Sequence, residues 1–206
     1  MKDQDDEPQR IGVPLKYDVK ATDPAQQEHE LRISINFEDD GERAFLNVRL
    51  DYISGAFLGQ TINPLADWTA SREHPSPYGQ PGAADVGGGE RKLPMEWRGS
   101  GIGTLLQSIL TLWIKEQPNV VLEEIFFSRS DVVDSDGEID VVALTRRRNF
   151  WENFGFQFDL SEDGSSGHSK RMYSSKLQVP IRGKSNSRGW ILELPSDLQA
   201  PLAATD

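Results

Sequence analysis

The chain has 206 residues, no cysteine and a formal net charge of −11 at pH 7. This length suits one domain with a substantial core and flanking segments. The lack of cysteine excludes disulfides, thiolate metal ligands and a cysteine nucleophile, and the acidic balance argues against nucleic acid, whose binding draws most of its affinity from a basic surface. The charge favours a cationic partner, such as an amine or a basic protein segment, although solubility alone explains it equally well.

The first ten residues are acidic and polar, and we expect residues 1–10 to form a disordered arm. They lack the features of a signal peptide, and no apolar run approaches the length of a membrane span. The sequence therefore predicts a cytoplasmic protein without a membrane partner. The histidines, at positions 29, 74 and 168, are too scattered to indicate a metal site.

Three strands are predicted in the first quarter of the chain. Apolar residues alternate through residues 13–20, which predicts a first strand. Residues 24–30 leave room for at most one helical turn. Residues 31–37 and 44–53 flank an Asp-Gly turn signal and predict a β-hairpin.

Proline and glycine dominate residues 54–90, where we expect a long insertion without regular structure. Two interpretations are open: a lid whose aromatic residues wall an acceptor site, or a flexible linker whose Trp68 packs on the core. Residues 91–97 are then expected to form the strand that leads into a glycine-rich turn.

The glycine-rich turn runs from Arg98 to Thr104, and the apolar spacing after it predicts a helix over residues 105–115. Backbone N–H groups at a helix N-terminus lack intrahelical partners and attract anions. A Walker A loop is excluded because no Lys follows Gly103. The dinucleotide motif is incomplete as well, although Glu123 and Glu124 have the spacing of a ribose-binding acid and keep a nucleotide-dependent oxidoreductase as an alternative.

Beyond this helix, residues 120–128 predict a buried parallel strand and residues 129–140 an acidic surface loop. The loop resembles a calcium-binding loop only superficially, because its Gly and Glu are out of register. Residues 141–154 predict a further helix with Val142, Leu144 or Thr145, Phe150 and Phe154 facing inward.

Three segments resemble the GNAT N-acetyltransferase family. Arg98, Gly101 and Gly103 match its acetyl-CoA loop, R/Q-x-x-G-x-G/A. Residues 149–156, Asn-Phe-Trp-Glu-Asn-Phe-Gly-Phe, resemble its closing helix and turn, F-Y-E-K-L-G-F, and residues 170–177 resemble its last strand. The resemblance extends over residues 91 to 178.

The resemblance implies an α+β fold with a mixed, mostly antiparallel central sheet, splayed parallel strands 4 and 5, and flanking helices. The GNAT-like domain would span residues 11–180, interrupted by the 54–90 insertion and followed by a C-terminal extension at 181–206. The implied activity is transfer of an acetyl group from acetyl-CoA to an amine on a small molecule or a protein. The implied acetyl-CoA-binding residues are Leu93, Met95, Arg98, Gly99, Ser100, Gly101, Ile102, Gly103 and Thr104.

The basic run Arg146 to Arg148 either contacts the CoA phosphates or forms a solvated face. The family often uses a Tyr as general acid where this chain has Trp151, whose indole N–H does not titrate usefully. We therefore consider Ser128, Tyr173 or water as the acid.

Glu96 and Asp51 are the candidate general bases. A CoA-binding or interaction module without turnover is the second alternative function. Residues 190–194 are predicted to be either a late strand that pairs across a homodimer or a tail that docks on the core, and we favour the docked tail.

Overall fold

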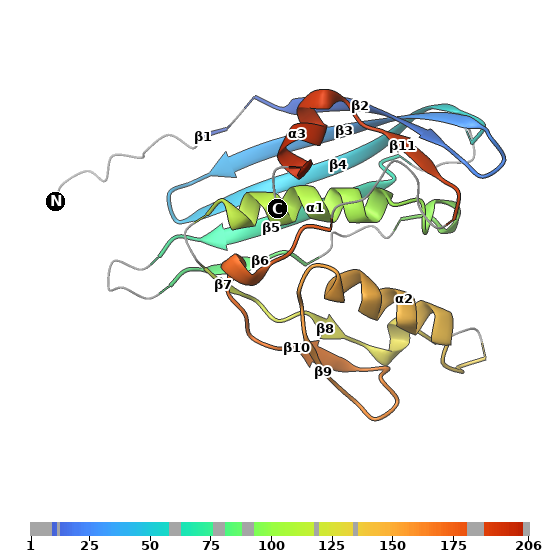
Figure 1. The fold of residues 1–206 in the computed structure, drawn as a ribbon. Coiled ribbons are helices and arrows are strands. Elements are labelled where there is room, and N and C mark those ends of the chain that lie inside the picture. The colour runs from blue at the N-terminus through green and yellow to red at the C-terminus, as the bar shows by residue number, and fades with distance from the viewer. Residues whose placement is uncertain are drawn as a thin grey trace.

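The computed structural model describes residues 10–11, 13–57, 63–75, 81–87, 93–117, 120–133, 136–180 and 188–203. A large, curled and mostly antiparallel sheet has the strand order β11-β2-β3-β4-β5-β6-β7, with β1 paired to β3 (Figure 1). These strands are β1 (Arg10–Ile11), β2 (Leu15–Thr22), β3 (Glu28–Asp39), β4 (Arg43–Gly55), β5 (Ala66–Glu73), β6 (Ala83–Asp85), β7 (Val121–Leu122) and β11 (Ile191–Glu193).

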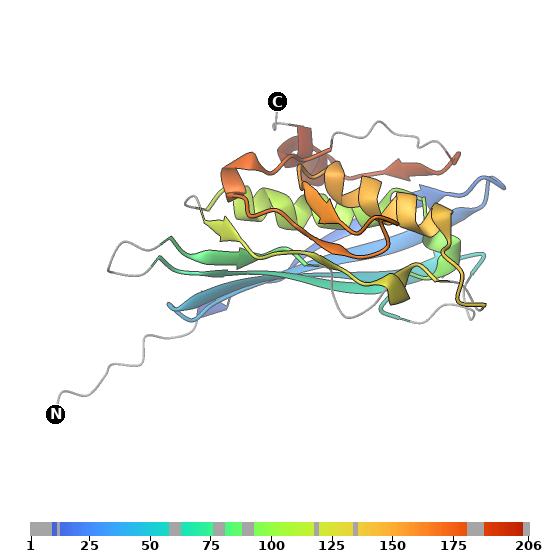
Figure 2. The same ribbon diagram turned by 90° about the horizontal axis from the view of Figure 1, so that it is seen from below.

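The described α-helices lie on one face of this sheet, and the opposite face carries none of them (Figure 2). They are α1 (Ile102–Lys115), α2 (Val141–Glu152) and α3 (Ser196–Ala203). Three short 3₁₀ helices connect other elements, namely η1 (Met95–Trp97), η2 (Arg129–Asp131) and η3 (Ser174–Lys176). The architecture is therefore a mixed α+β fold, as the sequence predicts.

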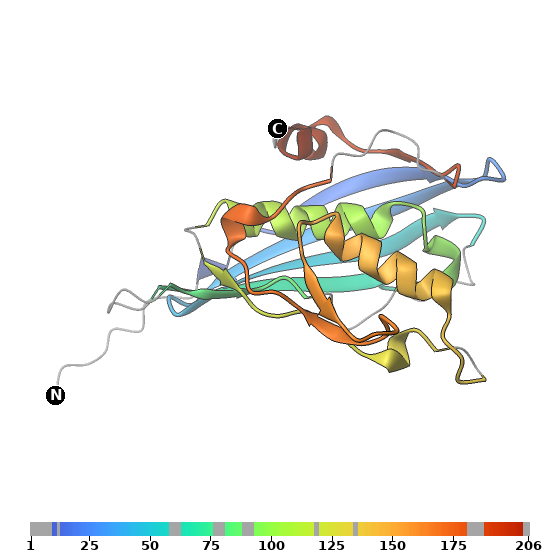
Figure 3. The same cartoon turned by 60° about the horizontal axis from the view of Figure 1, so that its bottom comes forward.

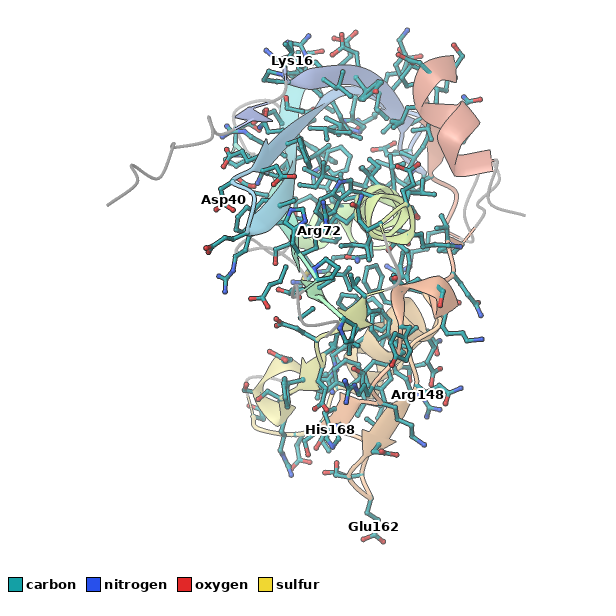
Figure 4. All side chains as sticks on the ribbon, turned by 90° about the vertical axis from the view of Figure 1, so that its left-hand side faces the viewer. Lys16, Asp40, Arg72, Arg148, Glu162 and His168 are labelled. Carbon is teal, nitrogen blue, oxygen red and sulfur yellow. The ribbon has the colours of Figure 1, made fainter. Side chains whose placement is uncertain are left out.

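A second, smaller sheet lies beside α2 in the order β8-β10-β9 (Figure 3). Its strands are β8 (Phe126–Phe127), β9 (Phe158–Leu160) and β10 (Gly167–Ser169). Lys16 on β2 and Glu162 in the turn between β9 and β10 lie at opposite ends of the molecule (Figure 4).

The first strand and the hairpin are confirmed. β3 and β4 pair in antiparallel register around the turn at Gly41, whose φ is +85°. Alternate side chains of both strands are buried because they face α1, which contacts β4 and β5. Residues 23–27 form a tight turn instead of a helix, with Gln26 N donating to Asp23 O (2.9 Å).

The expectation that residues 54–90 lack regular structure is wrong, because the segment supplies β5 and β6. The inner face of β5 carries two alanines, at positions 66 and 70, together with Trp68 and Arg72. Such a strand lacks the run of large apolar residues that marks a buried strand in sequence. β5 places Trp68 beside Phe150 of α2, with ring centroids 6.4 Å apart.

The expected strand at residues 91–97 is also wrong within its described part. Met95 to Trp97 form η1, in which Trp97 N donates to Pro94 O (3.1 Å) and Arg98 N donates to Met95 O (3.1 Å). The parallel pair of the sheet is therefore β6–β7, and not the fourth and fifth strands.

The strand expected over residues 120–128 is divided between two sheets, because β7 pairs with β6 whereas β8 pairs with β10. Residues 170–177 do not form the expected strand. Tyr173 makes an isolated antiparallel bridge to Val121, and η3 follows it. Helix α2 begins after Asp140, whose side chain accepts hydrogen bonds from the amides of residues 142 and 143. Val142 is 65% exposed, against expectation, whereas Phe154 is buried as predicted.

β11 pairs with β2 of the same chain, and Trp190 just before it is buried. This segment thus docks on its own chain, as favoured, but as a strand of the main sheet and not as a tail. No helix among the described residues has the length and apolar character needed to cross a membrane.

The turn between β9 and β10 is organised by the carboxylate of Asp163. Its Oδ1 accepts hydrogen bonds from Ser165 N (3.0 Å), Ser165 Oγ (2.8 Å) and Ser161 Oγ (2.7 Å). The Ser165 amide first, and then the two hydroxyls, lower the pKa of Asp163 from 3.8 to about 2. Because this pKa lies below the ordinary value, the carboxylate stabilises the turn above about pH 4. That stabilisation is lost as the pH falls toward 2.

We expect the Asp163 carboxyl signal to titrate near pH 2 in an NMR titration. Ser165→Ala removes one donor and should raise this pKa part of the way toward its ordinary value. An ordinary pKa for Asp163 in the unmodified protein would contradict the hydrogen-bonded turn.

Candidate functional site

The glycine-rich turn connects η1 to α1 through two left-handed residues. Gly99 has φ +83° and Gly101, the N-cap of α1, has φ +92°, a conformation that side chains with a Cβ rarely adopt. Ser100 between them is buried, and its Oγ accepts a hydrogen bond from Ile102 N (3.2 Å). The turn therefore holds the N-terminus of α1 in a fixed, tightly bonded conformation.

Two arginines flank this helix N-terminus. Arg98 Nε donates to Leu93 O (3.4 Å), and Arg188 Nη1 donates to Arg98 O (3.3 Å). The Gly103 and Thr104 amides belong to the first turn of α1, where N–H groups have no intrahelical acceptor. Backbone amides, the positive end of a helix dipole and guanidinium groups together suit an anionic group such as a pyrophosphate.

Arg188 was not predicted to belong to the site, because it lies far along the chain in the expected C-terminal extension. Its side chain packs so closely on the turn that a Cβ added to Gly99 would lie 2.5 Å from Arg188 Cδ. Gly99 is thus favoured by its left-handed backbone conformation, whereas the Arg188 contact is made by the end of a flexible side chain that can move. A sequence signal for Arg188 does not exist, since only the docking of β11 brings the arginine here.

Apolar side chains surround Gly103 in the first turn of α1. A Cβ added there would lie 3.3 Å from Leu93 Cδ1, 3.5 Å from Trp68 Cη2 and 4.0 Å from Phe150 Cε2. These three side chains come from the segment before η1, from β5 and from α2. They form an apolar wall beside the helix N-terminus.

The parallel strands β6 and β7 part beside α1, where Gln107, about one turn beyond Gly103, donates to Val86 O. Their ladder includes the bonds from Val121 N to Gly82 O (3.0 Å) and from Glu123 N to Ala84 O (2.8 Å). Beyond Glu123 the chain leaves β6 and enters the small sheet as β8. Asp85, at the end of β6, is a half-buried carboxylate at this point that the sequence analysis assigned to the insertion.

The predicted catalytic residues lie in different surroundings. Glu96 is exposed on η1, and Ser128 is exposed at the N-cap of η2, where its Oγ lies 2.8 Å from Ser130 Oγ. Their catalytic roles remain predictions. Asp51 alternates with the buried Leu50 on β4, and it therefore lies on the face of the sheet away from α1, where it pairs with Arg49.

The other residues predicted to bind acetyl-CoA likewise include both exposed and buried side chains. Met95 is 76% exposed on η1, while Leu93 is buried in the apolar wall. In the basic run, Arg147 donates to Ser128 O (2.7 Å) and Ser165 O (2.8 Å), and it stacks on Phe127 with Cζ 4.2 Å from the ring centroid. Arg147 therefore joins α2 to the small sheet.

Arg146 and Arg148 are exposed, and Arg148 pairs with Glu152. Trp151, at the position of the family's tyrosine, packs against Phe150 and Phe156 with ring centroids 5.1 and 5.5 Å away.

A polar network is buried on the other side of the glycine turn, beside Trp97. His29 Nδ1 lies 3.1 Å from Tyr52 Oη, and His29 Nε2 lies 3.5 Å from Asp23 Oδ2. Burial raises the pKa of Tyr52, which keeps its phenol protonated and able to donate to His29. Aromatic rings enclose the imidazole; they belong to Tyr52, Phe57, Trp97 and Trp190. No sequence motif links the members of this network, so the sequence alone does not reveal it.

The chain matches no protein-family model, no curated protein and no solved structure at a significant level. Among the described residues, no group of three or more His, Asp or Glu side chains is arranged to hold a metal ion.

Proposed function

We propose that this protein is an acetyl-CoA-dependent N-acetyltransferase with a GNAT-like fold. The observation that carries the proposal is the glycine turn at the N-terminus of α1, which lies beside a parallel strand pair that parts. In the GNAT family a turn of this sequence binds the CoA pyrophosphate, and a splayed strand pair accepts the pantetheine arm. The order of the turn, α1, β7 and α2 along this chain agrees with that arrangement.

The chain's residues would divide the binding between a charged end and an apolar end. Arg98, Arg188 and the first-turn amides of α1 would bind the pyrophosphate. Trp68 and Phe150 would contact the less polar arm. The acidic net charge of −11 favours a cationic amine as acceptor.

The proposed reaction moves an acetyl group from sulfur to nitrogen. The neutral amine attacks the thioester carbonyl carbon, a C–N bond forms, the C–S bond breaks, and the ammonium proton passes through a base or water to the departing thiolate. We propose Glu96 as the base and Ser128 as the acid. The place of the usual tyrosine is taken by Trp151, which does not exchange this proton.

The first test is titration calorimetry of acetyl-CoA against the protein and two glycine variants. Gly101→Glu places a carboxylate where the pyrophosphate would bind, and we expect it to abolish micromolar binding. Gly41→Glu is the matched control, since Gly41 has a similar φ of +85° and a Cβ there would meet nothing within 4 Å. The control should bind like the unmodified protein.

Absence of acetyl-CoA binding by the folded, unmodified protein would overturn the proposal. Equal binding by Gly101→Glu would show that the ligand does not use the turn. Circular dichroism of each variant confirms that loss of binding is not loss of fold.

Turnover separates the enzyme from the two alternative functions. We expect acetyl-CoA-dependent thiol release in the presence of small cationic amines or a basic peptide. Tight binding without thiol release would favour a CoA-binding module, and preference for NAD over CoA would favour the nucleotide-dependent oxidoreductase.

A further inference from the structure

Two side chains form hydrogen bonds with the backbone groups through which the parallel ladder of β6 and β7 would continue. The ladder advances by two residues at each step, from Val121 N→Gly82 O to Glu123 N→Ala84 O. The next step would join Ile125 N to Val86 O. Neither group makes that bond.

Instead, Gln107 on α1 donates from Nε2 to Val86 O (3.1 Å), and Ile125 N donates to Ser169 Oγ (3.0 Å) on β10. Gln107 and Ser169 are both buried. Unpaired backbone groups at this depth would be costly, so the two side chains remove the penalty for ending the ladder early. The strands can then stay apart without an orphaned N–H or C=O.

We propose that Gln107 and Ser169 are positioning residues that hold β6 and β8 apart, so that the extended, amide-containing arm of acetyl-CoA enters between them. This inference rests on the proposed function. It concerns residues outside the glycine turn, because Gln107 lies about one helical turn beyond Gly103 on α1 and Ser169 lies on β10.

A further observation concerns the second polar atom of Gln107. Its Oε1 is buried and has no hydrogen-bond partner among the described residues. Buried acceptors are rarely left without a donor. An amide N–H of the entering arm is a donor of the required kind, because the pantetheine arm carries two amide groups and little else that is polar.

The test removes both side-chain hydrogen bonds, those of Gln107 and Ser169, and compares the binding of two ligands. Gln107→Met keeps the length of the side chain without its amide, and Ser169→Ala removes the hydroxyl. In the double variant Ile125 N can bond directly to Val86 O, which closes the gap. We expect acetyl-CoA affinity to fall about tenfold or more, because binding must then break the new backbone bond.

3′-Phosphoadenosine 5′-diphosphate, which keeps the pyrophosphate of CoA but lacks the arm, is the second ligand in this test. Its affinity should be the same for the double variant and the unmodified protein. A purely structural role for the two residues would lower stability and affect both ligands alike, or neither. The comparison therefore isolates the arm from the phosphate end.

Ser174→Ala is the matched control for Ser169→Ala. Ser174 makes the same pair of bonds at the opposite end of the strand: its N donates to Val120 O (2.9 Å), and its Oγ accepts from Val120 N (3.2 Å). Ser169 N likewise donates to Ile125 O (2.9 Å). Because Val120 precedes the paired part of β7, Ser174→Ala should leave acetyl-CoA affinity unchanged.

A spectroscopic measurement keeps the test independent of affinity. A scalar coupling across a hydrogen bond from Ile125 N to the Val86 carbonyl carbon should appear in the double variant and be absent from the unmodified protein. If the double variant does not fold, the single variants are compared in the same two assays.

Unchanged acetyl-CoA affinity together with no new coupling would overturn the inference while leaving the proposed function intact. Failure of the unmodified protein to bind acetyl-CoA would overturn both. Equal weakening of acetyl-CoA and 3′-phosphoadenosine 5′-diphosphate would also overturn it, since the defect would then lie outside the arm.

Discussion

Trp97→Ala should lower the free energy of unfolding by about 3–5 kcal/mol, as measured by chemical denaturation. Trp97 is 0% exposed and packs among His29, Tyr52, Phe57 and Trp190 at the centre of the aromatic cluster. Removing its indole leaves a large cavity that neighbouring rings fill only in part. The same change should weaken acetyl-CoA binding, because the indole anchors residue 97, whose backbone carbonyl accepts from Ser100 N (3.2 Å) in the glycine turn.

Trp97→Phe is the informative companion variant. Trp97 Nε1 is buried without a hydrogen-bond partner among the described residues, so the phenylalanine loses ring volume but no hydrogen bond. We expect Trp97→Phe to lower the free energy of unfolding clearly less than Trp97→Ala does. Trp113→Ala, at a half-buried tryptophan beside Phe37, should also cost less. A loss below about 1 kcal/mol for Trp97→Ala would contradict the role of this side chain in the core.

The second large effect is expected for His29→Ala, with an unfolding free energy lowered by about 2–5 kcal/mol, because the variant removes a fully buried ring from the aromatic cluster. The variant leaves the Asp23 carboxylate and the Tyr52 phenol buried without the imidazole that lies between them. It also removes a ring that packs 4.5 Å from the centroid of Phe57. Both consequences act on the same end of the sheet.

His168→Ala is the matched control for His29→Ala. The His168 side chain is 48% exposed and pairs with Glu124, also exposed, at 3.4 Å. Exposed pairs of this kind contribute little, and we expect a change within about 0.5 kcal/mol. If the two histidine variants lose equal stability, the buried network does not stabilise the fold.

Several elements could be predicted because their sequence pattern coincides with their tertiary role. The β3–β4 hairpin alternates apolar and polar residues around an Asp-Gly turn, and α1 repeats its apolar residues at helical spacing. The glycine turn was also located, since left-handed positions demand glycine. These signals are local, because residues close together in the sequence determine each of these elements.

The failures have the opposite cause, because each depends on distant residues. β5 was missed because Ala66 and Ala70 fit beneath a helix without forming an apolar run. The strand at 120–128 was predicted as one element, since no local signal reports that it changes partner at Ile125. Val142 was placed inward although the face of α2 that packs on the rest of the protein is set by Phe150 and Phe154.

The candidate site shows the same division. Arg98 and the glycines were identified from their order in the sequence, whereas Arg188 and the Asp23–His29–Tyr52 network were not. These residues meet only after strands far apart in the chain have paired.

The placement of β11 has a consequence for the order of synthesis on the ribosome. β2 is made early, yet its outer neighbour in the sheet is a strand made much later, and the intervening loop must close before the pair forms. Until residues 188–193 have left the ribosome, β2 has a free edge, Trp190 is missing from the aromatic cluster, and no Arg188 covers Gly99. A nascent chain can therefore complete most of the sheet before it can complete the proposed anion-binding end, and chaperone protection of the β2 edge is expected to matter most during that interval.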